Sequence, residues 1–232
     1  RHMGIISIEK LDHLYWLGRY TERVYTTLRK FFRVFDDMIE APEGSYTYYC
    51  ERLNIPDIYT SNQQFAESYL YGKDNPDSLY SNMNRAFDNA IVLRDELSSN
   101  VLSYMQMALD VFEKEQREMA PRLELQSVLD DLLAFWGCVD DYVEDEECRN
   151  IMKCGKYVER LDLYIRLEYH TKDIEKEFSK LTNRLHKTPM YYDAATLEKI
   201  AGMIHDKLSC PEKMAGRDQE LLDCLGNIIE VR

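Results

Sequence analysis

The most constraining feature of this sequence is a short pattern that occurs twice, far apart in the chain. Residues 18–23 and 155–160 both read glycine, basic residue, tyrosine, variable residue, glutamate, arginine, and Arg29 and Arg166 follow the two glycines at the same distance. Each copy lies among apolar residues at three- and four-residue steps, which predicts an amphipathic helix. A glycine inside a helix costs about 1 kcal/mol relative to alanine, so two equivalent glycines indicate a compensating close approach. We therefore expect two long helices that cross near Gly18 and Gly155.

The remainder of the chain favours an all-α fold. Its 232 residues include only nine glycines and six prolines, and the sequence has no segment with the alternating pattern of a strand. We expect a single-domain helical bundle of about 7–9 helices over residues 4–232, with residues 1–3 a cloning remnant.

Turn and capping residues set the expected limits of these helices. Asn75 is expected to cap a helix with Pro76 at its first position, Pro121 to open another, and Asp193 to cap a third. The acidic run at residues 140–147 is expected to be a solvated surface at the start of the second repeat helix. Residues 45–70 are less regular. The expected helices cover residues 8–39, 46–53, a stretch up to 70, 75–97, 99–119, 121–136, the second repeat, 171–185, 193–208 and 218–229.

The charge of the chain argues against nucleic-acid and membrane binding. A formal net charge of −13 repels both phosphate backbones and anionic lipid surfaces. No segment is apolar enough for a transmembrane span and none looks like a secretory leader, so we expect a cytoplasmic protein. The six cysteines form no pair or Cys/His set with zinc spacing, which favours reduced thiols.

Familiar cofactor motifs are missing from the sequence. Paired glutamates on neighbouring helices are typical of di-iron carboxylate bundles, but the Glu-x-x-His motif of those proteins does not occur. The sequence also lacks a phosphate-binding loop, a dinucleotide-binding glycine motif and a nucleophile elbow. We therefore expect neither a metal nor an organic cofactor.

The carboxylates of the repeats are the first candidates for a functional site. Glycine and glutamate are four residues apart in each copy, about 40° around the helix, so Glu22 and Glu159 should point toward the crossing. Three interpretations remain open: ordinary surface ion pairs within each helix, a buried structural Glu–Arg network, and a ligand-binding or catalytic site. A further helix carries Arg85, Asn89 and Arg94, which either join this polar centre or form an exposed face.

Several separated motifs resemble the alpha-E family, a bacterial all-helical group of unknown function. Residues 14–23 read Leu-Tyr-Trp-Leu-Gly-Arg-Tyr-Thr-Glu-Arg and are similar to the family's opening signature, residues 75–78 to its Asn-Pro-x-Ser helix start, residues 85–95 to its arginine-rich helix, and residues 155–166 to its closing helix, with Asp162. The chain departs from the family at Phe87 and Ile91, which replace two arginines, and at Cys154 and Lys156.

The resemblance implies a role in peptide or amide-bond modification beside ATP-grasp ligase-like and transglutaminase-like partner proteins. The ligand would be a peptide or amino-acid carboxylate held by arginines, with Glu22 and Glu159 orienting them or binding an amine. One alternative makes Glu22 or Glu159 a general base in amide chemistry, and another makes the motifs purely structural with the acidic surface as a docking platform. The expected ligand-binding residues are Arg19, Tyr20, Glu22, Arg23, Asn89, Arg94, Tyr157, Glu159, Arg160 and Arg166.

Overall fold

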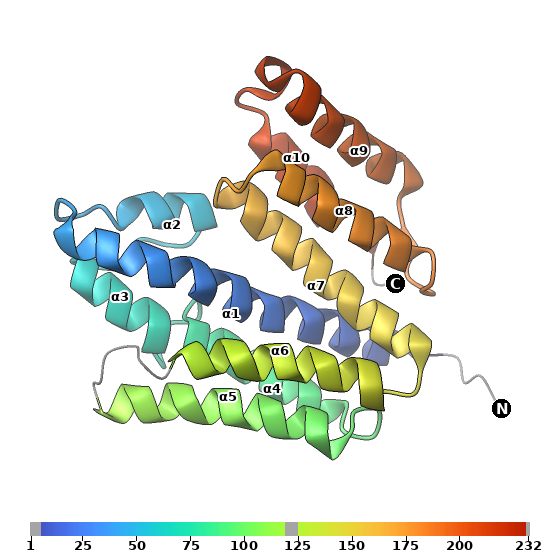
Figure 1. Cartoon of the computed structure of the whole chain (residues 1–232), viewed down its shortest axis with the longest axis horizontal. Coiled ribbons are helices and arrows are strands. Elements are labelled where there is room, and N and C mark those ends of the chain that lie inside the picture. The colour runs from blue at the N-terminus through green and yellow to red at the C-terminus, as the bar shows by residue number, and fades with distance from the viewer. Residues whose placement is uncertain (1–5, 119–124, 231–232) are drawn as a thin grey trace. The chain divides into compact units, whose positions relative to one another are not determined.

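The structure is a computed structural model that describes residues 6–118 and 125–230. Within these residues it contains ten α-helices, one short 3-10 helix and a two-stranded pairing (Figure 1). The all-α class is confirmed: the ten α-helices slightly exceed the bundle of about seven to nine that was expected and equal the number of helical ranges expected along the chain. The elements are α1 (Ile8–Glu40), α2 (Thr47–Leu53), α3 (Asn62–Tyr71), α4 (Leu79–Val92), α5 (Ser99–Glu118), α6 (Leu125–Tyr142), α7 (Glu146–Arg166), α8 (Thr171–Leu185), β1 (Tyr191–Tyr192), α9 (Ala194–Ser209), η1 (Pro211–Met214), α10 (Asp218–Gly226) and β2 (Ile229–Glu230).

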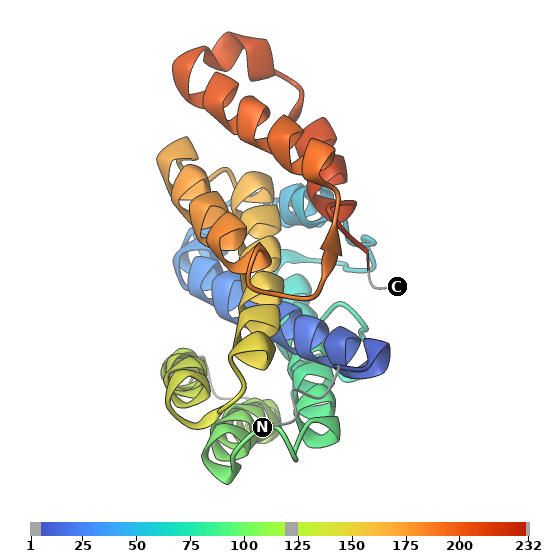
Figure 2. The same cartoon turned by 90° about the vertical axis from the view of Figure 1, so that its right-hand side faces the viewer.

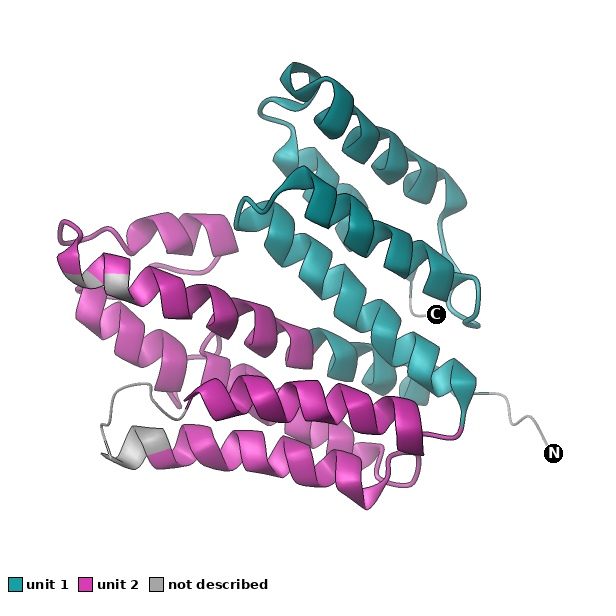
Figure 3. Ribbon diagram, in the orientation of Figure 1, with its two compact units in different colours: residues 1–19, 145–232 teal, residues 20–144 magenta. Residues whose placement is uncertain are grey.

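The chain divides into two compact units (Figure 3). Unit 1 contains residues 1–19 and 145–232, and unit 2 contains residues 20–144. The long helix α1 contributes its residues up to Arg19 to unit 1 and its residues from Tyr20 onward to unit 2. The expectation of a single domain over residues 4–232 stays a prediction.

Unit 2 has a core that is rich in aromatic rings. Phe31 from α1 packs against Phe65 and Tyr69 from α3, with ring centroids 5.8 and 5.1 Å away. The buried tyrosines place their hydroxyls on polar partners: Tyr46 Oη donates to the Tyr59 carbonyl at 2.7 Å, and Tyr59 Oη accepts from Asn75 Nδ2 at 2.8 Å. Burial raises the pKa of Tyr59 to about 12. The abundance of tyrosine therefore reflects core positions that need both a ring and a hydrogen bond.

Unit 1 is built on the pair α7 and α8, which lie side by side in both views (Figures 1 and 2). Helix α9 packs on α8, and α10 packs on both α9 and α7. Asp145 caps α7 by accepting from Glu147 N and Cys148 N, and Asp193 caps α9 by accepting from Ala195 N. The expected cap at Asp193 and the acidic first turn of the second repeat helix are thus confirmed.

Two sequence-based expectations about the end of the chain are wrong. The last helix ends at Gly226 instead of continuing to residue 229, and a short antiparallel pairing follows where no strand was expected. Tyr191 pairs with Glu230 and Tyr192 with Ile229. The backbone N–H of Asp193 also donates to the Ile228 carbonyl at 3.0 Å. The chain end therefore satisfies its backbone groups on the segment that precedes α9, a partner too distant in sequence for helical periodicity to indicate.

The expected start of α4 is also wrong by several residues. Ser78, not Asn75, is the N-cap: its Oγ accepts from Ser81 N at 3.0 Å, and the helix begins at Leu79. Asn75 is instead buried, with its Oδ1 accepting from Asp77 N in the preceding turn and its amide bound to Tyr59. The helix ends at Val92 rather than at residue 97, although Leu93 and Leu97 remain buried in the turns that follow.

Some expectations fall outside the described residues. These are the cloning remnant at residues 1–3, the end of a helix at Met119 and the helix start at Pro121. The described part of α6 begins at Leu125, within the helix expected there.

Removing the Ser78 hydroxyl tests the corrected start of α4. Ser78→Ala deletes the cap and the hydrogen bond from Ser78 Oγ to the Gly72 carbonyl at 2.7 Å. We expect a loss of about 1–2 kcal/mol in the free energy of unfolding, measured by urea denaturation. Ser103→Ala, at an exposed position inside α5, is the matched control and should change the free energy of unfolding by less than about 0.5 kcal/mol. Equal effects of the two changes would contradict the assignment of Ser78 as the cap.

Candidate functional site

The two repeated glycines lie at a helix crossing in which backbone touches backbone. A Cβ atom added at Gly18 would overlap the Met152 carbonyl oxygen, and a Cβ atom added at Gly155 would overlap the Tyr15 carbonyl oxygen. Each glycine therefore faces the carbonyl of the residue three positions before the other glycine. Since no side chain fits, the crossing predicted near Gly18 and Gly155 is confirmed, and it accounts for glycine at both positions.

This crossing brings Arg19 of α1 against Glu159 of α7. Arg19 Nε donates to Glu159 Oε2 at 2.7 Å, and the two side chains are 19% and 3% exposed. The Arg19 guanidinium lies 4.7 Å from the ring centroid of Trp16, a cation–π contact. Burial lowers the pKa of Arg19, but the charge and hydrogen bond of Glu159, together with the smaller effects of Tyr15 and Asp162, outweigh burial and raise the pKa. The buried Glu–Arg interpretation therefore describes this pair, in which each charge is already neutralised by the other.

A second ion pair lies further along α7. Arg166 Nε donates to Asp162 Oδ2 at 2.7 Å, and both side chains are about one-fifth exposed, at 18% and 21%. Burial raises the pKa of Asp162, and the hydrogen bond from Arg166 opposes that shift. The guanidinium of Arg166 thus has a carboxylate of its own helix as partner.

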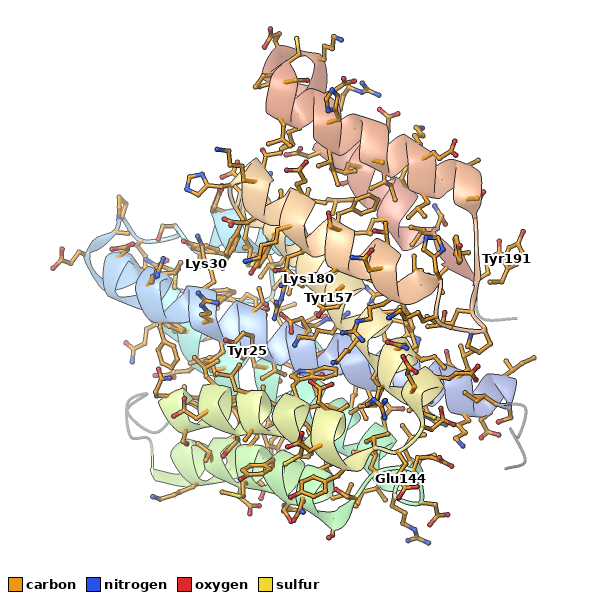
Figure 4. All side chains as sticks on the ribbon, turned by 45° about the vertical axis from the view of Figure 1, so that its right-hand side comes forward. Tyr25, Lys30, Glu144, Tyr157, Lys180 and Tyr191 are labelled. Atoms are coloured by element: carbon orange, nitrogen blue, oxygen red, sulfur yellow. The ribbon has the colours of Figure 1, made fainter. Side chains whose placement is uncertain are left out.

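A third group of charges joins α7 to α8, and we call it the Glu177 cluster (Tyr157, Arg160, Glu177, Lys180). Arg160 Nη1 lies 3.4 Å from Glu177 Oε2, and Lys180 Nζ lies 2.9 Å from Glu177 Oε1. Glu177 is only 7% exposed. The Lys180 ammonium also lies 5.8 Å from the ring centroid of Tyr157, and Figure 4 shows these two side chains beside each other. The Glu177 carboxylate therefore binds two cations, and one of them, Lys180, also lies over the ring of Tyr157.

A comparable group lies in unit 2, between α1 and α4, and we call it the Asn82 cluster (Tyr20, Arg23, Asn82, Arg85). Arg23 Nη1 and Arg85 Nη1 donate to the same oxygen, Asn82 Oδ1, at 3.1 and 3.3 Å. Both guanidiniums also approach the Tyr20 ring, at 5.4 and 5.9 Å from its centroid. Two positive charges thus converge on an acceptor that carries no charge.

Asn82 is held in this orientation by its own amide group. Its Nδ2 donates to the carbonyls of Ser78 at 2.9 Å and Asp77 at 3.4 Å, and the residue is 2% exposed. The side-chain oxygen must therefore point away from the backbone of α4, toward Arg23 and Arg85. The arrangement therefore orients both guanidiniums on one uncharged oxygen.

Arg85 is the cation of this group with only uncharged partners. Its contacts are the Pro76 carbonyl at 2.7 Å, Asn82 Oδ1 and the Tyr20 ring. Among the side chains that the structure describes, Arg85 forms no ion pair with a carboxylate. A guanidinium has five N–H groups in a fork that matches a carboxylate, so Arg85 keeps donors to offer.

The other candidate residues have different surroundings. Glu22 is 1% exposed and accepts a hydrogen bond from Thr26 Oγ1 one turn later in α1. Asn89 is half-buried and donates its Nδ2 to the Arg85 carbonyl of its own helix at 3.0 Å. Arg94 is exposed in the turn after α4, so the exposed-face interpretation describes this residue.

Sequence reasoning missed the two acceptors that organise the clusters, Asn82 and Glu177. Both are polar residues at buried positions of an otherwise apolar helix face. Each is followed three residues later by a cation, Arg85 or Lys180, and that shared spacing is the signal that could have drawn attention to them.

The described residues show no other site of a familiar kind. Across 6–118 and 125–230, no three His, Cys, Asp or Glu side chains gather as metal ligands would. None of the helices in that part of the chain combines the length and apolar character that crossing a membrane requires.

Comparison with known proteins identifies a family by sequence. The Alpha-E family model, described as a predicted alpha-helical domain with a conserved ER motif, matches residues 10–202. The chain has Glu-Arg in both copies of the repeat, at 22–23 and 159–160, and also at 51–52. No curated protein and no solved structure matches the chain.

Adding a methyl group at either crossing glycine tests the backbone contact. Gly18→Ala and Gly155→Ala should each lower the free energy of unfolding by about 3 kcal/mol, because the new Cβ meets a carbonyl oxygen that belongs to helix backbone. Gly137→Ala is the matched control, since a Cβ at this glycine inside α6 meets nothing within 4 Å. It should stabilise the protein by about 0.5–1 kcal/mol. Urea denaturation measures all three, and a neutral Gly18→Ala would contradict the crossing geometry.

Proposed function

Because the chain belongs to the alpha-E family, whose description gives a fold and a motif but no reaction, we propose its function from the chemistry of its own side-chain clusters. We propose that the protein binds a peptide or an amino acid through a carboxylate group of that ligand. The observation that supports this proposal is the Asn82 cluster, where Arg85 has only uncharged partners among the described residues. The ligand carboxylate would accept from the remaining N–H groups of Arg85, beside Arg23 and the ring of Tyr20.

The net negative charge of the chain bears on how the Asn82 cluster could attract an anion. A protein with a formal net charge of −13 repels anions at long range. Arg85 has only uncharged partners among the described residues, so a negative group beside its guanidinium would be electrostatically favourable. A carboxylate would bring that charge in the planar geometry that a guanidinium fork matches.

The other arginines proposed from the sequence are less suited to hold the ligand. Arg19, Arg160 and Arg166 each donate to a carboxylate of this chain, and Arg94 lies exposed outside the clusters. The proposed ligand site is therefore narrower than the sequence-based one: it keeps Tyr20 and Arg23, and it adds Asn82 and Arg85.

We further propose that the protein acts as an accessory, substrate-binding component of a peptide-modification system with an ATP-grasp ligase-like or transglutaminase-like partner. A carboxylate is the group that becomes an amide in peptide ligation, which agrees with binding at the Asn82 cluster. Glu159 is engaged by Arg19 and Glu22 accepts from Thr26, so binding is favoured over general-base catalysis by either residue.

Titration with small carboxylates tests the binding function. Acetate, free glutamate and a short glutamine-containing peptide with a free or amidated C-terminus should be compared by calorimetry. The free-carboxylate forms are expected to bind more tightly at low salt than at high salt, because the contact is ionic. Arg85→Gln should weaken binding by about tenfold or more, equal to about 1.4 kcal/mol. Arg33→Gln, which removes an exposed charge from α1 of the same unit, should leave binding unchanged.

Several outcomes would contradict the proposal. The first is that no carboxylate binds. The second is that Arg85→Gln and Arg33→Gln lower the binding affinity equally. The third is that inorganic phosphate binds more tightly than every carboxylate tested. The partner is tested separately by co-purification with an ATP-grasp ligase-like protein encoded beside this chain. If the two proteins do not co-purify at low or moderate salt, the proposed partner is contradicted, but the proposed carboxylate site is not.

A further inference from the structure

Helix α6 of unit 2 carries a buried carboxylate for which the described chain provides no partner. Asp131 is 8% exposed and lies at the edge of the apolar face that α6 buries. Among the residues that the structure describes, its side chain makes no hydrogen bond and no ion pair. The other buried acidic residues in the described ranges each accept from a donor of the chain; they are Glu22, Glu159 and Glu177. Within those ranges, Asp131 is therefore the buried acid that lacks a donor.

The position is unfavourable for an ionised carboxylate that stays alone. Burial takes the carboxylate out of water, and no group of the described chain replaces the hydrogen bonds that it loses. Burial and, after it, the charge of the neighbouring Asp130 raise the pKa of Asp131. A positive group from outside the chain would supply the missing partner.

The carboxylate of Asp131 is still open to solvent. Some side-chain oxygens and nitrogens of the described chain are fully enclosed and lack a hydrogen bond, and none of them belongs to Asp131. On an α-helix, the residues four before, three after and seven after a given residue lie on the same face. For Asp131 these are Ser127, Ala134 and Cys138, which are small and half-buried. We call this face the Asp131 strip (Ser127, Asp131, Ala134, Cys138); its small side chains leave room for a slender group beside the carboxylate.

The charge and chemistry of α6 favour a small cation. The helix contains four aspartates and no lysine or arginine. A divalent metal ion would need several ligands, and no three His, Cys, Asp or Glu side chains gather around a common point in the described residues. An ammonium group is a compact charge with three N–H donors on a slender stem, whereas a guanidinium is a broad, planar fork. The narrow opening at Asp131 therefore fits an ammonium group better than a metal ion or an arginine.

We propose that Asp131 binds a primary ammonium group, from a lysine side chain or a free amine, that approaches along the Asp131 strip. The ammonium donates to the carboxylate, and the charge-assisted hydrogen bond replaces those that burial removed. Ammonium binding at Asp131 is independent of the carboxylate binding proposed at Arg85, and either can hold without the other.

NMR titration tests the site in the unaltered protein, followed at the carboxyl carbon signals of the aspartates. The probes are methylammonium, Nα-acetyl-lysine amide and tetramethylammonium, each added at constant ionic strength. Methylammonium and acetyl-lysine amide should shift the Asp131 signal to saturation. Tetramethylammonium has the same charge but no N–H donor, and it should cause no saturable shift at Asp131.

Three variants separate the site from general charge effects, with binding followed at the backbone amide signals of α6. Asp131→Asn removes the charge with almost no change of shape and should weaken methylammonium binding by about tenfold or more. Asp130→Asn, the matched control, makes the same change at the adjacent exposed position and should alter the affinity by at most about twofold. Ala134→Leu keeps the carboxylate but narrows the strip, and should also weaken binding. It serves as the test variant if Asp131→Asn does not fold.

The outcomes that overturn the ammonium site are specific. One is the absence of a saturable shift at Asp131 with both methylammonium and acetyl-lysine amide. Another is an equal response to tetramethylammonium, and a third is an equal loss of affinity in Asp131→Asn and Asp130→Asn. Tighter binding of acetyl-lysine amide than of methylammonium would support a lysine side chain as the source of the ammonium, and the reverse order would support a free amine.

Discussion

The contact between the backbones at Gly18 and Gly155 sets the positions on which the first polar pair depends. Each glycine meets the carbonyl of the residue three positions before the other, so the two helices approach in a single register. That register places Arg19, the residue after the first glycine, against Glu159, four residues after the second. A side chain at either glycine would push the helices apart and separate a buried charge from its partner, which costs far more than the glycines themselves.

The charges of the repeat are satisfied in different ways along the chain. In unit 1, Arg19, Arg166 and Arg160 each reach a carboxylate, and all three carboxylates lie on helices that pack around α7 or on α7 itself. In unit 2, the corresponding cluster uses the neutral oxygen of Asn82. A carboxylate is a stronger acceptor for a guanidinium than an amide oxygen is. The two clusters therefore differ in the charge of the acceptor that their cations share.

The sequence predicted the parts of this structure that local physics controls. The two crossing helices follow from apolar periodicity and from the cost of helical glycine, and the cap at Asp193 follows from local side-chain chemistry. The start of α4 was misplaced because Asn75 satisfies the same turn rules as Ser78, and only burial against Tyr59 decides between them. The acceptors Asn82 and Glu177 were missed because their role depends on burial in an otherwise apolar helix face, which residue identity alone does not show.

Arg85 is the cation of the Asn82 cluster whose partners among the described residues are all uncharged. It lies beside Arg23 on the shared Asn82 oxygen. A half-buried cation whose partners carry no negative charge is a cost that proteins can retain where binding requires it. Glu177 instead brings a carboxylate to Arg160 and Lys180. The amide of Asn82 leaves Arg85 with N–H donors in a fork that fits a carboxylate, and the proposed binding function depends on those donors.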